Sequence, residues 1–181
     1  GNVINDLVDS GNIERRDITL VTKVGYIQGQ NYKNAEKRKK NGNPFPEVVE
    51  YGEGLWHCIH PEFLEDQLKH QLTRLNLDYI DAYLLHNPEY YLSWADKEWK
   101  RIDEARDEFY VRIRMAFEWL QKKVNEGVIK SYGVSSNTFV SDPHKFDFTS
   151  LETMYKISEE TAQKFECENA FSVIQFPFNL I

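Results

Sequence analysis

The sequence predicts an α/β protein built around a parallel β-sheet. Stretches with helical periodicity alternate with short, mostly apolar stretches typical of strands, in the order α-β-α-β-α-β-α-β. Strands that alternate with helices are joined by right-handed crossovers and therefore lie parallel. The chain has 181 residues, of which 41% are hydrophobic and 28% charged, and this composition suits one packed domain.

The first half of the chain predicts a short helix, a strand, a long connection and a second helix. The apolar residues of positions 3–8 are spaced as on one helix face. Residues 18–24 form a β-branched, mostly apolar run, which indicates a strand buried on both faces. Residues 25–60 are rich in glycine and proline and predict a long irregular βα loop, which in a compact domain is usually functional. A leucine stripe predicts a helix over 61–75.

The second half continues the same alternation. In chain order we predict a strand at 79–86, a second long βα loop at 87–107, a helix at about 108–126, a strand at 131–135, a weaker helix at about 150–165 and a strand at 171–176. Gly127 is a typical helix stop in the left-handed conformation. The two long loops both leave the carboxyl ends of strands, so we expect them to wall a pocket there.

Polar residues stand at the end of each predicted strand. They are Lys23, His86, the run 135–137 (Ser-Ser-Asn) and Gln175. Taken singly, each has an ordinary structural role, such as an ion pair, a hydrogen-bonded histidine or a helix N-cap. Because the carboxyl ends of parallel strands share one edge of the sheet, their common position favours a functional site.

Composition disfavours several other classes of protein. Lys and Arg number 22 against 29 Asp and Glu, and this net charge of −7 argues against a nucleic-acid-binding face. The basic run 37–40 is interpreted as a solvated loop face. The sequence contains no apolar stretch of about 18 residues, so no membrane span is predicted, and no signal peptide is recognisable. Cys58 and Cys167 cannot form a disulfide framework and favour a cytoplasmic protein with reduced thiols.

Metal and nucleophile motifs give little support for other chemistry. His57, Cys58 and His60 are close in sequence, but their spacing is cramped for zinc and no second pair of ligands follows. We therefore expect no metal site. A Gly-x-Ser-x-Gly elbow and a glycine-rich phosphate loop are both missing from the sequence.

Four segments together resemble the aldo-keto reductases. They are 15–25 (RRDITLVTKVG), 68–86 (ending DYIDAYLLH), 126–137 (EGVIKSYGVSSN) and 173–179 (VIQFPFN). The resemblance implies a (β/α)8 barrel that binds a nicotinamide cofactor, usually NADPH, with NAD not excluded. It also implies reduction of a small carbonyl compound, or oxidation of an alcohol, by an Asp, Tyr, Lys and His set.

The resemblance assigns roles to the polar residues at the strand ends. Lys23 and His86 correspond to the catalytic lysine and histidine, and Ser136, Asn137 and Gln175 to residues that contact the nicotinamide carboxamide. Of the two adjacent serines, the one beside Asn137 is preferred. A nearby Lys⁺ lowers the pKa of a tyrosine that donates a proton, and a histidine can orient the carbonyl oxygen. Amide side chains suit a carboxamide, which both donates and accepts hydrogen bonds.

Three further residues are expected to contact substrate, because they lie in or near the long loop that follows Lys23. They are Tyr26, Trp56 and His57. Tyr26 follows Lys23 closely, but it is not in the position of the family tyrosine.

The resemblance covers only part of the family pattern. The Asp and Tyr of the family's catalytic set, and the family's last two strands, have no matching segment in the sequence. We therefore expect residues 1–181 to be a partial aldo-keto reductase domain, with about four consecutive β/α units of the barrel, and to be inactive alone. The intact parent would be an NADP(H)-dependent oxidoreductase. The alternatives are a noncatalytic regulatory or binding subunit and, less favoured, an unrelated barrel hydrolase. The sequence predicts no oligomeric state.

Overall fold

A four-stranded parallel sheet forms the centre of the computed structural model, which describes residues 2–178. Its strands are β1 (Val21–Val24), β5 (Ile80–His86), β6 (Ile129–Ser135) and β7 (Phe171–Gln175). They lie side by side in the order β1-β5-β6-β7, and every pairing is parallel. This arrangement confirms the predicted parallel α/β class.

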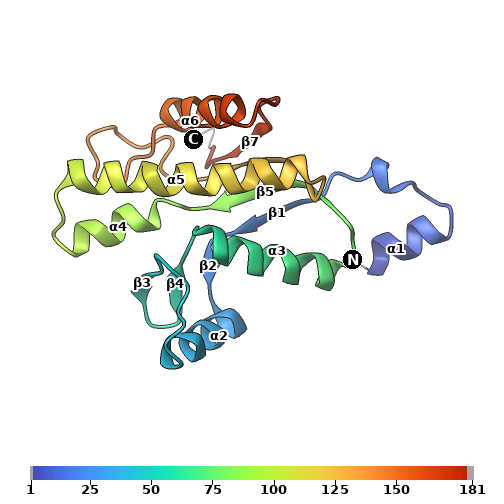
Figure 1. The fold of residues 1–181 in the computed structure, drawn as a ribbon, viewed down its shortest axis with the longest axis horizontal. Coiled ribbons are helices and arrows are strands. Elements are labelled where there is room, and N and C mark those ends of the chain that lie inside the picture. The colour runs from blue at the N-terminus through green and yellow to red at the C-terminus, as the bar shows by residue number, and fades with distance from the viewer. Residues whose placement is uncertain (1, 179–181) are drawn as a thin grey trace.

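Three helices cover one face of this sheet. They are α3 (Pro61–Leu75), α5 (Ile102–Asn125) and α6 (Leu151–Lys164), with α5 between the other two (Figure 1). Phe117 and Leu120 of α5 are fully buried, as are Tyr83 and Tyr132 of the sheet. Burying aromatic and leucine side chains of this size stabilises the helix layer by about 2–3 kcal/mol each. The helical span predicted over 61–75 is confirmed by α3.

The connection between β1 and α3 is not the irregular loop that the sequence predicted. It contains β2 (Tyr26–Ile27), α2 (Gly29–Lys40), β3 (Val49–Gly52) and β4 (Leu55–His57). The three strands form a separate antiparallel sheet in the order β2-β4-β3. Figure 1 shows this small sheet and α2 projecting from one side of the main sheet.

The second long loop, predicted over 87–107, is also partly helical. It holds α4 (Tyr90–Lys97), and α5 begins at Ile102. The first turns of α5 are mostly charged and bury only Ala105, so they show no apolar stripe. No helix within residues 2–178 is both long and apolar enough to cross a membrane.

The first strand is shorter than predicted because side chains take up the backbone groups before it. Helix α1 (Asn2–Asp9) and the 3-10 helix η1 (Arg15–Asp17) precede it. Arg15 donates a hydrogen bond to the carbonyl oxygen of Ile18, and the carboxylate of Asp81 accepts one from the amide of Leu20.

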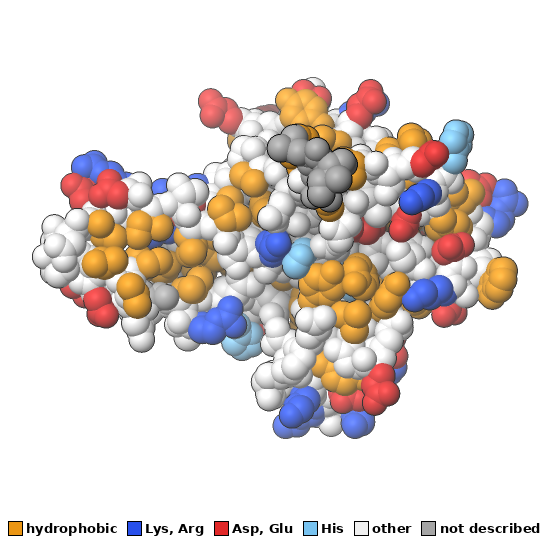
Figure 2. Space-filling view, turned by 180° about the vertical axis from the view of Figure 1, so that it is seen from behind, with side chains coloured by type: hydrophobic (Ala, Val, Ile, Leu, Met, Phe, Trp, Pro, Cys, Tyr) orange, Lys and Arg blue, Asp and Glu red, His pale blue; other side chains and the backbone are white. Residues whose placement is uncertain are grey.

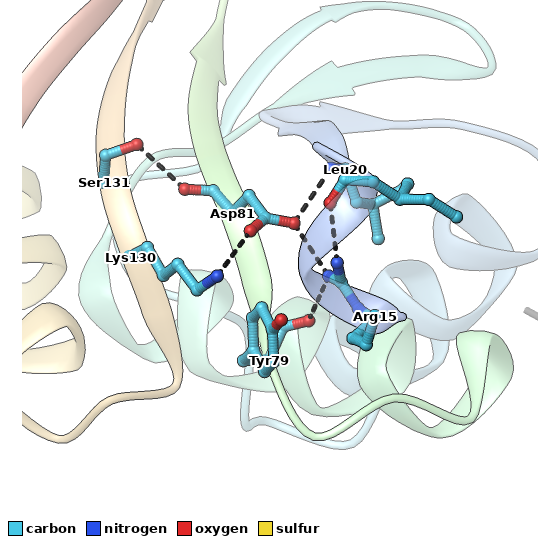
Figure 3. Close-up of polar contacts among 7 residues, drawn as sticks. Arg15, Leu20, Tyr79, Asp81, Lys130 and Ser131 are labelled. Carbon is cyan, nitrogen blue, oxygen red and sulfur yellow. Dashed lines mark hydrogen bonds and ion pairs between the residues drawn. The ribbon is translucent and has the colours of Figure 1, made fainter. Parts of the chain in front are cut away.

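Asp81 is the centre of a polar cluster at the amino end of the sheet, shown in Figure 3. Its carboxylate lies 2.8 Å from Arg15 Nη2 and 2.9 Å from both Lys130 Nζ and the amide of Leu20. Its backbone carbonyl accepts a hydrogen bond from Ser131 Oγ at 2.8 Å. Burial opposes the charged form, but the Leu20 amide and the two cations outweigh it, so the pKa of Asp81 is lowered. The cluster joins β1, β5 and β6.

The two outer strands of the sheet are exposed. Val21 of β1 has 47% of its surface exposed and Ile174 of β7 has 40%. The prediction that the first strand is buried on both faces is therefore wrong, since Val21 points to the same face as Lys23, opposite the covering helices, while Val24 is buried. Over residues 2–178 the sheet does not close into a barrel.

Candidate functional site

The strand register brings the predicted residues to one face and one end of the sheet. His86, Ser135 and Gln175 are direct neighbours across β5, β6 and β7. Lys23 is the neighbour of Leu84, which is two residues before His86 and therefore points to the same face. These residues lie on the sheet face opposite the helices.

A cavity of about 360 Å³ lies at this end of the sheet. Its lining residues are Lys23, Tyr26, His86, Asn87, Ser135, Asn137, Gln175, Phe176 and Pro177. Figure 2 views the molecule from behind, away from the covering helices, and shows a cationic side chain and a histidine side by side near the centre. Hydrophobic side chains gather on both sides of this polar pair.

Gln175 is the hydrogen-bonding centre of the cavity. Its Oε1 accepts a bond from Lys23 Nζ at 2.9 Å and one from Ser135 Oγ at 3.1 Å. Both bonds use the carbonyl end of the side chain, and its amide nitrogen is the donor that Gln175 can offer to a ligand. Three strands thus contribute to one network at the carboxyl end of the sheet.

His86 is half-buried beside this network. Burial lowers the pKa of its imidazole, and the positive charge of Lys23 lowers it further. The side chain is therefore neutral at physiological pH and carries one N–H. A neutral imidazole can donate one hydrogen bond to an oxygen atom in the cavity.

Ser135, and not the predicted Ser136, presents its hydroxyl to the cavity. Successive residues of a strand point to opposite faces, so Ser136 points toward the helix side. Its Oγ is buried and lies 3.1–3.2 Å from the hydroxyls of Thr149 and Thr138. The preference based on adjacency to Asn137 therefore chose the serine that does not line the cavity.

Asn137 lines the cavity and is held there by a residue that the sequence analysis missed. Glu89 is 4% exposed, and its Oε1 accepts hydrogen bonds from the Asn137 amide at 2.8 Å and from Asn87 Nδ2 at 3.0 Å. Burial raises the pKa of Glu89. The signal available in the sequence was an acidic residue directly after Asn87 and Pro88, close to the end of a buried strand.

The three expected substrate contacts have different surroundings. Tyr26 lines the cavity, and its ring packs edge-on against His86 with centroids 4.7 Å apart. Trp56 is buried against Tyr32 and does not line this cavity. His57 is 2% exposed, and its Nε2 lies 2.7 Å from the backbone oxygen of His86. The structure therefore brings only Tyr26 of the three to the cavity.

The three residues considered for a metal are engaged in other contacts. The Cys58 thiol donates to the Pro46 carbonyl at 3.4 Å, and burial raises its pKa to about 12. His60 caps the N-terminus of α3 by accepting a hydrogen bond from the Glu62 amide. Along the part of the chain that the structure describes, no three His, Cys, Asp or Glu side chains cluster as metal ligands do.

A parallel sheet with Lys, His, Ser and Gln gathered at the carboxyl ends of its strands is the arrangement of an α/β enzyme or ligand-binding protein. The profile of the Aldo/keto reductase family matches residues 1–179. The chain belongs to this family, which confirms the resemblance found in the sequence. The last residue of the resembling segments, Asn179, lies outside the described residues.

Relatives with assigned names cover about half of the chain. Aldo-keto reductase family 1 member C21 of Rattus norvegicus is 32% identical over 99 residues, which are 53% of this chain and 30% of that protein. NADPH-dependent aldose reductase GRE3 of Saccharomyces cerevisiae is 32% identical over 97 residues, or 45% of this chain and 28% of that protein. Each match therefore spans less than a third of the relative.

Solved structures resemble the chain over most of its length. An aldo-keto reductase from Bombyx mori in complex with NADP is 14% identical with a TM-score of 0.47, and the match covers 97% of this chain and 38% of that one. A glycerol dehydrogenase from Gluconobacter oxydans is 20% identical with a TM-score of 0.49, covering 94% and 35%.

Proposed function

We propose that this chain carries part of the active site of an NADP(H)-dependent oxidoreductase that acts on a small carbonyl compound, such as an aldehyde, ketone or sugar, or on the corresponding alcohol. The observation that carries the proposal is the meeting of Lys23, His86 and Gln175, from three strands, around one cavity. Family membership supplies the class of reaction, and the yeast relative is named for its use of NADPH.

The donor set of the cavity fits a nicotinamide carboxamide. Gln175 offers the N–H groups of its amide, because its oxygen already accepts from Lys23 and Ser135. Ser135 offers a hydroxyl oxygen that can accept, and Asn137 lines the same cavity. Such groups hold the carboxamide and so fix which face of the ring is presented to substrate. When bound, the nicotinamide would supply or accept the hydride.

Lys23 and His86 are suited to the charge that develops on the carbonyl oxygen. The neutral imidazole of His86 donates a hydrogen bond to that oxygen and holds it in place. The ammonium of Lys23 stabilises negative charge in the cavity and favours the ionised form of a phenol placed beside it. Tyr26 shapes the cavity wall next to His86 and is proposed to contact the substrate.

We also propose the wider setting of this site. The four consecutive parallel strands correspond to part of a (β/α)8 barrel, as the family implies, and residues 1–181 form a partial barrel domain. Both cysteines are free thiols in the structure, which supports a cytoplasmic location.

Titration of the 181-residue protein with NADPH, followed by nucleotide fluorescence, tests the cofactor assignment. Gln175→Ala should weaken binding by about tenfold, a loss of about 1.4 kcal/mol, because the carboxamide loses its amide partner. Gln30→Ala is a matched control, since this exposed glutamine on α2 contacts Asn34. Equal affinity of the two variants would contradict the assignment of Gln175.

A noncatalytic binding subunit is the second candidate. The observation that favours it is that Ser135, Asn137 and Gln175, which suit a carboxamide, all line the cavity, and binding alone requires no further group. Such a protein would bind NADPH through Ser135, Asn137 and Gln175 but would not consume it. Binding without turnover in every longer form of the protein would support this alternative.

A further inference from the structure

His57 is a buried histidine that does not line the cavity but contacts His86, a residue that does. It belongs to β4 of the small antiparallel sheet, yet its Nε2 lies 2.7 Å from the backbone oxygen of His86 at the end of β5. It is paired in register with Tyr26, and its ring stacks on Tyr90 with centroids 5.6 Å apart. The contact therefore joins the two sheets at the residue proposed to orient substrate.

The imidazole of His57 takes a place that a strand amide would otherwise fill. The register of β1 and β5 ends with Val24 opposite Leu85, and the next pair would be Gly25 with His86. The chain turns into β2 at Gly25, whose φ is 151°. Where a parallel ladder stops, the last carbonyl of the longer strand, here that of His86, has no strand amide opposite it. It needs another donor, because an unpaired buried polar group is costly.

Gly25 provides the space that this contact requires. A Cβ at this position would lie 2.6 Å from His57 Nε2 and 2.7 Å from the His86 oxygen. Both distances are too short for unbonded atoms, so any other residue would push the donor and acceptor apart. The carbonyl of Gly25 also accepts a hydrogen bond from the Cys58 amide at 2.9 Å, which fixes the end of β4 beside it.

Burial also determines the form of the imidazole. It lowers the pKa of His57 to about 4, so the ring is neutral at physiological pH. A carbonyl only accepts hydrogen bonds, so the single proton of the ring lies on Nε2. The ring is therefore held in one tautomer.

The same small sheet contacts the side chain of His86. Tyr26, the register partner of His57, packs its ring edge-on against the His86 ring at 4.7 Å. The backbone of His86 is thus held by His57 and its side chain by Tyr26, and both restraints come from the inserted β2–β4 pair.

We propose that His57 is a positioning residue for His86: its Nε2–H, accommodated by Gly25, holds the end of β5 so that the His86 imidazole points into the cavity. The proposal rests on the proposed function for its meaning in catalysis, but the positioning itself is a property of the chain without cofactor. It assigns the small antiparallel sheet a role in orienting the histidine of the proposed active site.

Imidazole ¹H–¹⁵N correlation spectra of the uniformly labelled 181-residue chain test this proposal. His57→Phe keeps an aromatic ring but removes the donor, and it should shift and broaden the His86 ring signals. His57→Gln keeps an N–H at the position of Nε2 and should restore them toward wild type. His144→Phe, at an exposed site, is the matched control and should leave them unchanged.

Gly25→Ala provides a second, independent perturbation, because it separates the same two atoms without altering His57. Its His86 signals should resemble those of His57→Phe. Circular dichroism checks that each variant is folded, and if His57→Phe is not, Gly25→Ala and His57→Gln decide. Unchanged His86 signals in a folded His57→Phe or Gly25→Ala variant would overturn the proposal.

The NADPH titration separates this proposal from the proposed function. If no variant or wild-type chain binds NADPH but the His86 signals respond as stated, the positioning role stands and the cofactor assignment fails. If NADPH binds and the signals do not respond, the positioning role fails alone.

Discussion

The two adjacent serines at the end of β6 have different surroundings because a strand alternates its faces. Ser135 shares its face with His86 and Gln175, its neighbours across the sheet. Ser136 belongs to a buried group of hydroxyls with Thr138 and Thr149. Two consecutive serines therefore differ in role: Ser135 lines the cavity, and Ser136 is part of the buried structure behind it.

Alanine substitution should separate the two roles. Ser135→Ala removes one hydrogen bond worth about 1 kcal/mol at the cavity and should weaken NADPH binding about fivefold with little loss of stability. Ser136→Ala removes the acceptor of the buried Thr138 backbone amide, 3.1 Å from Ser136 Oγ, and should lower the free energy of unfolding by about 1–3 kcal/mol. NADPH titration and urea unfolding of both variants measure the two effects. The opposite pattern would indicate that Ser136, and not Ser135, contacts the cofactor.

His57 should make stability depend on pH. Its pKa is about 4 in the folded chain against 6.5 for the unperturbed side chain. As pH falls below about 6.5, the unfolded chain takes up a proton that the folded chain does not, so stability is lost until the pH passes the folded value. From this pKa difference the loss approaches about 3 kcal/mol.

Urea unfolding of wild type and His57→Gln at about pH 7 and about pH 4.5 measures this contribution. Wild type should lose more stability between the two pH values than the variant, which has no titrating group at this position. Since His86 is present in both proteins, its own contribution cancels in the comparison. Equal losses would show that His57 is protonated in the folded chain.

At the scale of elements, Gly133 determines how β6 and β7 pair. A Cβ at this position would overlap the backbone carbonyl of Val173. The pairing also shifts register between Tyr132 and Gly133, where the two backbones approach closely. The position of Gln175 at the end of β7 therefore depends on a glycine in the middle of β6.

Gly133→Ala should destabilise the chain by at least about 3 kcal/mol, because the overlap is with backbone and cannot be relieved by a side-chain rotation. It should also abolish NADPH binding, since β7 carries Gln175. Gly52→Ala is the control, as a Cβ there meets no atom within 4 Å, and it should change stability by less than about 1 kcal/mol. Urea unfolding compares the two. A mild effect of Gly133→Ala would mean that β7 can move away from β6 without a loss of stability.

The elements that the sequence predicted well are those with a strong pattern. Helix α3 was predictable from its leucine stripe, and the four parallel strands from their apolar runs. Helix α2 buries only Ala35 and therefore shows no stripe. Strands β2 and β4 span two and three residues, too few to show alternation. Their pairing depends on contacts between distant residues, which a local pattern does not contain.

The candidate site was predictable in part for the same reason. Lys23, His86 and Gln175 follow apolar strands, and their place at one end follows from the parallel order. Glu89 could not be recognised, because its role depends on a contact with Asn137, 48 residues away. His57 is similar, since its contact with His86 depends on an inserted sheet that no pattern predicted.

At the scale of the whole molecule, the two ends of the sheet differ in chemistry. The amino end carries the Asp81 cluster, in which charges are paired by Arg15 and Lys130. The carboxyl end carries Lys23 and Gln175 around a cavity. In (β/α)8 barrels the amino ends of the strands support stability and the carboxyl ends carry function, and the groups at the two ends of this four-stranded sheet differ in the same way.

Carbonyl reduction by the 181-residue chain requires both a group that stabilises the oxygen and a proton donor. Lys23 and His86 can stabilise and orient a carbonyl oxygen, but reduction also needs a proton donor, and Tyr26 is the one tyrosine among the described residues that line the cavity. Tyr26 lies in the cavity, but burial raises its pKa above the ordinary value, so it is a poor proton donor.

We therefore expect the purified chain to consume no NADPH in the presence of an aromatic aldehyde, measured by nucleotide absorbance, even at concentrations where NADPH binds. Steady consumption that is lost in Lys23→Met would contradict this expectation and would identify Tyr26 as the donor to test next.

In a longer form of the protein that contains the family tyrosine, His86→Ala should reduce turnover by two or more orders of magnitude, because the carbonyl oxygen loses its hydrogen-bond donor.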